Sequence, residues 1–64
     1  MARDDDIIIE FYPVGNAVKV SAVDPRTLVE VSIVGDPRQG KAALERAVVD
    51  KLRYVLRGGK ARGT

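Results

Sequence analysis

The alternation of residues on either side of Gly15-Asn16 constrains the fold of this chain more than any other feature. Residues 7–14 are rich in β-branched and aromatic side chains and residues 17–24 alternate with a period of two, so both segments are predicted to be strands. Gly-Asn between two such segments is typical of a two-residue hairpin turn. Closing that turn pairs Phe11 with Val20, and the alternation then agrees across both strands. One face of the hairpin carries the apolar side chains of Ile7, Ile9, Phe11, Val18, Val20 and Ala22.

A third strand is predicted for residues 28–34, which are again rich in β-branched residues. Asp and Pro open the connection at residues 24–27, as they do in a type I turn. A loop of even length keeps Val31 and Ile33 on the same face as Val20, whereas an odd length would turn them outward. The three strands are therefore expected to form an antiparallel meander.

A helix is predicted to close the chain. Residues 36–39 (Asp-Pro-Arg-Gln) are typical of a helix N-terminus, with an N-cap, a proline at the first position and a glutamine that can complete a capping box. We expect the helix to cover residues 41–57, to start at either Pro37 or Lys41, and to stop at Gly58. Its apolar stripe consists of Leu44, Ala47, Val48, Leu52, Val55 and Leu56.

These elements predict an α+β fold, a three-stranded antiparallel β-meander with one C-terminal helix packed on one face (βββα). A single domain at residues 7–57 is expected between a disordered acidic N-terminus at residues 1–6 and a flexible basic tail at residues 58–64. The three aspartates at residues 4–6 are interpreted as charges that discourage the first strand from recruiting other strands. The predicted core comprises Ile9, Phe11, Val18, Val20, Val31, Ile33, Leu44, Val48, Leu52 and Val55.

The 64 residues include no cysteine and no histidine. Their absence removes disulfides, thiolate metal sites and the commonest general base. Ser21 and Ser32 lie in strands with no base nearby, and we expect no pocket of roughly 300 Å³ or more beside one helix and three strands. The sequence therefore predicts a protein that is not an enzyme and that takes no cofactor, metal ion or small-molecule substrate.

The longest apolar run, at residues 7–9, is far shorter than a membrane span or the apolar part of a signal peptide. A chain with neither of these segments, and without cysteine, is predicted to be cytoplasmic and to have no membrane partner.

The segment from Gly35 to Lys41 nearly matches a phosphate-binding P-loop, in which backbone N–H groups surround phosphates and a Ser or Thr binds Mg²⁺. Here Ala42 stands where the hydroxyl belongs, and Pro37 removes one N–H donor. The expected sheet is also antiparallel. An ordinary capped connection between a strand and a helix is therefore the favoured interpretation.

The second face of the sheet, away from the helix, is more apolar than a face left to water usually is. We interpret it as an interaction face, which makes the chain a small interaction module that associates with a second copy of itself or with an unidentified protein. An edge strand of the sheet is the other surface that could pair. The residues of the interaction face are Ile8, Tyr12, Val23 and Val34.

An alternative interpretation is a nucleic-acid-associated protein, because basic residues share the outer face of the helix and continue into the tail. The net charge of +2 does not demand such a partner, and Tyr54 is the one aromatic ring nearby. The residues that would contact nucleic acid are Arg46, Arg53, Arg57, Lys60 and Arg62.

Three segments carry a resemblance to a known family. Residues 13–25 (PVGNAVKVSAVDP), 30–35 (EVSIVG) and 51–56 (KLRYVL) are similar to a small bacterial family of uncharacterised proteins, a domain of unknown function. The resemblance covers most of residues 9–56. It implies a compact domain of about this length with no known activity, so it assigns no site residues.

One position departs from the family pattern, in which Gly follows Asp-Pro-x-Thr, whereas Leu28 stands here. The last position of a four-residue loop is left-handed, a conformation that costs leucine ~1–2 kcal/mol. We therefore expect this turn to be strained, or else shortened to residues 25–26.

Overall fold

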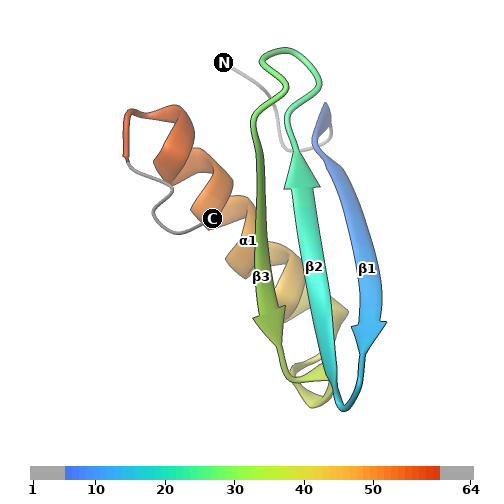
Figure 1. The fold of residues 1–64 in the computed structure, drawn as a ribbon. Coiled ribbons are helices and arrows are strands. Elements are labelled where there is room, and N and C mark those ends of the chain that lie inside the picture. Colours follow the sequence, from blue (N-terminus) through green and yellow to red (C-terminus); the bar gives the residue numbers. More distant parts are fainter. Residues whose placement is uncertain (1–5, 60–64) are drawn as a thin grey trace.

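The computed structural model describes residues 6–59 and has the predicted βββα architecture (Figure 1). The strands pair antiparallel in the order β1-β2-β3, and the helix crosses one face of the sheet behind β2 and β3 (Figure 1). The predicted acidic N-terminus and basic tail fall mostly outside the described residues. The elements are β1 (Ile8–Val14), β2 (Ala17–Val23), β3 (Glu30–Gly35), a 3₁₀ turn η2 (Pro37–Gln39) and α1 (Lys41–Leu56).

The first hairpin has the predicted register, with Phe11 opposite Val20 and Ile9 opposite Ala22. Gly15 has a φ of 58°, and Leu28 is the one described residue other than glycine with a positive φ. A left-handed glycine at the first turn position, followed by Asn16 at negative φ, is the geometry of a type II′ turn. This turn matches the twist of the strands and so fixes the register.

The second connection confirms the four-residue loop, since the N–H of Asp24 donates to the carbonyl of Val29 at 3.0 Å. Leu28 adopts the left-handed conformation with a φ of 64°, as the strained alternative predicted. The strand therefore begins at Glu30, two residues later than the sequence indicated. The register still places Val31 opposite Ala22 on the covered face.

The Asp24 side chain holds this loop together and is only 1% exposed. Its carboxylate accepts hydrogen bonds from the N–H of Arg26 at 2.9 Å and from the Thr27 hydroxyl at 3.2 Å. A buried carboxylate needs such partners to offset its lost hydration. Asp24 was predicted only as a turn-forming residue, and its burial is a finding of the structure.

The core lies between the sheet and α1. Five of the ten predicted core residues are buried, namely Val20, Val31, Leu44, Val48 and Leu52, and the other five, Ile9, Phe11, Val18, Ile33 and Val55, are partly buried and pack against them. Ile7 and Ala22 complete the buried set. The two predicted core residues of β1, Ile9 and Phe11, are only partly buried because α1 packs chiefly on β2 and β3.

Ala47 was wrongly placed in the apolar stripe of the helix, since its side chain is exposed. Leu44, Val48 and Leu52 are buried at intervals of four residues. Ala47 lies about 100° around the helix from Val48 and therefore points away from that row. Val49, which is partly buried, packs against the core instead.

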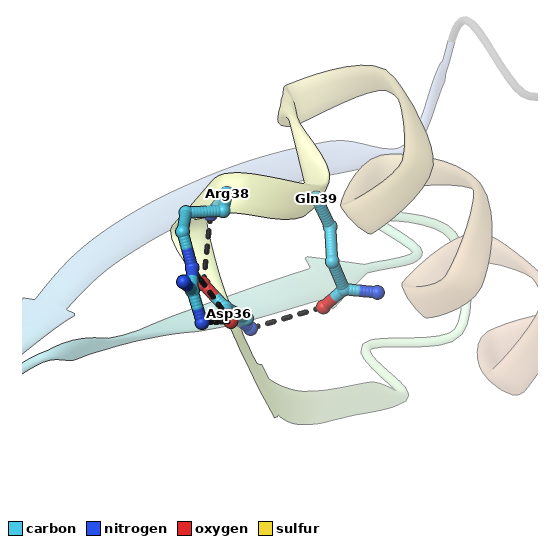
Figure 2. Close-up of polar contacts among 3 residues, drawn as sticks. All are labelled: Asp36, Arg38 and Gln39. Carbon is cyan, nitrogen blue, oxygen red and sulfur yellow. Dashed lines mark hydrogen bonds and ion pairs between the residues drawn. The ribbon is translucent and has the colours of Figure 1, made fainter.

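The two ends of the helix are set by glycines. The predicted capping box forms, but it caps η2, and Gly40 at a φ of 90° separates that turn from α1, so the helix starts at Lys41 (Figure 2). At the other end the N–H of Gly58 donates to the carbonyl of Val55 and that of Gly59 to Tyr54, both characteristic of a Schellman motif. Gly58 therefore ends the helix as predicted. No helix within residues 6–59 is long and apolar enough to cross a membrane.

Candidate functional site

The open face consists of the strand residues that point away from α1. The register arranges them in four rows across the sheet: Ile8, Val23 and Glu30, then Glu10, Ser21 and Ser32, then Tyr12, Lys19 and Val34, then Val14 and Ala17. The four predicted interaction residues therefore share one face, in the first and third rows with a polar row between them. Ile8 is 50% exposed, Tyr12 45% and Val34 70%, whereas Val23 is half-buried.

Tyr12 is held in place on this face by its polar end. The hydroxyl donates a hydrogen bond to the Glu10 carboxylate, and this bond, with smaller effects of desolvation and of the charges on Glu10 and Glu30, raises the pKa of Tyr12 above its ordinary value of 10.0. The hydroxyl thus has a partner on the sheet itself. The ring remains available for contact, which is how tyrosine commonly serves at interfaces.

The residues of the predicted nucleic-acid face are only partly described. Arg46 and Arg53 are exposed on α1, Arg57 is exposed directly after its last residue, and Lys60 and Arg62 lie outside the described residues. Arg46 and Arg53 line one wall of a groove, together with Glu45 and Asp50. Both signs of charge therefore meet there, whereas a phosphate-binding surface is normally dominated by positive charge.

This groove corrects the expectation that the fold leaves no pocket. It is open, has a volume of about 440 Å³ and lies between β1 and α1. Ile7, Ile9, Ala42 and Val49 form its apolar lining. It exists because α1 covers β2 and β3 and leaves the helix-facing side chains of β1 only partly covered.

The near match to a P-loop has a structural explanation. A Cβ on Gly35 would lie 2.4 Å from Leu44 Cδ2, so the glycine allows the strand to approach the helix closely. The Lys41 ammonium lies 5.3 Å from the centre of the Phe11 ring, in cation–π contact.

The loop's N–H groups are also engaged within the loop: the N–H of Asp36 donates to the Gln39 side chain at 3.0 Å, and that of Arg38 to the Asp36 carboxylate at 2.9 Å (Figure 2). The N–H groups of Gln39 and Gly40 donate to the carbonyls of Asp36 and Pro37. A P-loop would offer such groups to phosphate.

Fold and surface together define a small α+β domain with one covered and one open sheet face. A family model for a domain of unknown function, DUF6898, matches residues 4–61. The chain therefore belongs to this family, which confirms the resemblance to an uncharacterised domain family. It matches no curated protein and no solved structure.

One polar contact was not predicted from the sequence. The Lys51 ammonium donates to the main-chain carbonyl of Ser32 at 2.8 Å, across the outer edge of β3. Lys51 is separated from Ser32 by 19 residues. The position of the helix and the register of the strands together bring the two groups into contact, so no local sequence pattern predicts this hydrogen bond.

Proposed function

We propose that this domain is a protein-interaction module without catalytic activity that self-associates by packing its open face against that of a second copy. The observation that carries the proposal is the exposure of Ile8, Tyr12 and Val34 on a sheet face that no described element covers. Apolar residues gathered on one uncovered face favour burial against a partner.

The shape of the open face suits such a contact, because the three strands are of similar length, six or seven residues each, and no described element crosses them on this side. Packing two open faces would give a sandwich of two sheets with a helix on each outer surface.

Charge on the open face also suits a second copy. The face carries both signs of charge: Lys19 on β2 lies in the row next to that of Glu10 on β1, and Glu30 on β3 lies two rows away. A two-fold contact between identical faces can therefore offer each lysine a carboxylate of the partner. A face of one charge sign would repel its own copy.

Sedimentation equilibrium tests the proposal with a matched pair of variants. Val34→Lys places a charge on the open face, and Leu28→Lys places the same charge on a residue outside it that is similarly exposed. We expect the wild type and Leu28→Lys to associate alike and Val34→Lys to associate at least tenfold more weakly. A wild type that stays monomeric up to ~1 mM, the weak end of the affinity scale, would refute self-association.

Nucleic-acid binding is the second candidate, and the exposure of Arg46 and Arg53 on one side of α1, with Arg57 exposed directly after the helix, is the observation that favours it. Retardation of DNA or RNA that weakens steeply with salt, and that is lost when Arg46 and Arg53 are changed to Gln, would support it. Open-face variants would leave such binding unchanged.

A further inference from the structure

The two edges of the sheet are protected in different ways, and the alternation of ladder hydrogen bonds shows what each edge presents. Antiparallel pairs alternate between hydrogen-bonded and non-bonded. The bond from the N–H of Asp24 to the carbonyl of Val29 makes that pair a bonded one. The pair of Ser21 and Ser32 lies three positions further along the ladder, so it is non-bonded. The N–H and C=O of Ser32 therefore point away from β2, to the outer edge of β3.

The outer edge of β3 has the chemistry of a pairing site. Glu30 and Val34 are in the same phase as Ser32, so their N–H and C=O groups also point outward. A row of such groups is a template for a further strand. The strand itself does little to oppose pairing, because it contains no proline and its one charged residue is Glu30, at its first position. Protection of this edge therefore has to come from another element.

The edge of β1 differs, because its own sequence opposes pairing. Pro13 lies opposite Val18, which directs its main-chain groups to β3, so the N–H that proline lacks would have pointed outward. The three aspartates at residues 4–6 precede the strand, and charge beside an edge discourages pairing. Two features of the local sequence thus protect β1, whereas β3 has no proline and no run of like charges beside it.

The Lys51 side chain of α1 reaches the edge of β3. Its ammonium donates to the outward carbonyl of Ser32 at 2.8 Å, and the side chain is half-buried. A strand that pairs with β3 at Ser32 needs this carbonyl as an acceptor, and it would enclose the ammonium between itself and β3. Displacing the ammonium loses its hydrogen bond, and enclosing it costs free energy because a charge that is buried without a counter-ion loses its hydration.

We propose that Lys51 closes the β3 edge to strand pairing and so keeps the domain from associating edge to edge. A lysine at a sheet edge is a common means of preventing such pairing, and here α1 supplies the lysine that β3 lacks. With Pro13 and the aspartates at β1, both edges are closed. The proposal does not depend on open-face packing, because pairing at the edge uses main-chain groups and packing of the open face uses side chains.

Sedimentation equilibrium tests the proposal with three variants. Lys51→Met removes the ammonium but keeps an unbranched side chain, and Lys51→Arg keeps the positive charge. Arg46→Met lowers the net charge of +2 by the same amount as Lys51→Met, at a site beside β1. We expect Lys51→Met to associate at least tenfold more tightly than the wild type and the other two to behave like the wild type, with melting curves confirming that all three fold. No gain for Lys51→Met, or an equal gain for Arg46→Met, would overturn the proposal.

Two further measurements separate edge closure from open-face packing. Ile8→Lys places a charge on the open face at the strand farthest from β3, and in that background Lys51→Met is again expected to gain at least tenfold. Hydrogen exchange then locates the contact. The outward amide of Ser32 is expected to exchange quickly in the wild type at every concentration and at least tenfold more slowly in associated Lys51→Met. A Ser32 amide that is protected in the associated wild type, or unprotected in associated Lys51→Met, would overturn the proposal while leaving open-face packing untouched.

Discussion

The covered face and the open face of this sheet are built from alternate residues of the same strands, yet they differ sharply in burial. On the covered face Val20 and Ala22 of β2 are 0% exposed, whereas Val34 on the open face is 70% exposed. One helix can cover only one face, and here it covers mainly two of the three strands. The difference indicates that stability depends mainly on the covered face, and it is the exposed residues of the open face that we propose contact a second copy.

The largest effect is expected from Leu52→Ala, which removes a fully buried side chain of α1. Truncating such a leucine costs about 2–4 kcal/mol, close to the whole stability of a small domain. Thermal melting should show a large fall in the transition temperature or no cooperative transition. A transition like that of the wild type would mean that Leu52 is not part of the core.

A matched pair of valines compares the two faces directly. Val20→Ala on the covered face is expected to cost about 2 kcal/mol, and Val34→Ala on the open face to stay within about 0.5 kcal/mol of the wild type. Urea titration of dilute protein, where association is negligible, measures both. Equal losses at the two sites would contradict the assignment of the faces.

A substitution in the loop between β2 and β3 is expected to raise the stability of the protein rather than lower it. Leu28→Gly is expected to raise stability by about 1 kcal/mol, because glycine tolerates a positive φ and the leucine side chain is exposed. Leu28→Ala serves as the control, since it removes the same side chain but keeps the strain. Comparable melting temperatures for the two variants would show that the backbone of Leu28 is not strained.

The smallest effect concerns pH. The hydrogen bonds from Arg38 lower the pKa of Asp36 below its ordinary value of 3.8. The folded state therefore favours the ionised carboxylate of Asp36. The stability that this carboxylate contributes is fully present above pH 3.8, the pKa of an ordinary aspartate, and is lost as the pH falls through the lower pKa of the folded state. Asp36→Asn should flatten this part of the stability–pH curve. An identical curve for the variant would refute a role for the Arg38 contact.

Local patterns in the sequence predicted most of the fold. Gly15-Asn16 determined the hairpin register, the even loop set the phase of β3, and Gly58 marked the end of the helix, because each of these is fixed by neighbouring residues. The departure at Leu28 left two alternatives, a strained left-handed residue or a shorter turn, and the structure has the first. The residues of the covered face were predicted from the period-two alternation of apolar side chains along the strands.

The features that the sequence did not predict depend on how α1 lies on the sheet. The groove beside β1, the exposure of Ala47 and the contact between Lys51 and Ser32 all follow from that placement. Several placements of a helix satisfy the same apolar stripe, so the periodicity alone does not select one. The open-face residues could be predicted because strand alternation assigns a face without reference to the helix.

The most direct test of open-face self-association is isotope-filtered NMR on a mixture of labelled and unlabelled protein at a concentration where it associates. The account predicts intermolecular contacts from the side chains of Ile8, Tyr12 and Val34, and their loss in Val34→Lys. Association whose intermolecular contacts involve none of these three residues would contradict it.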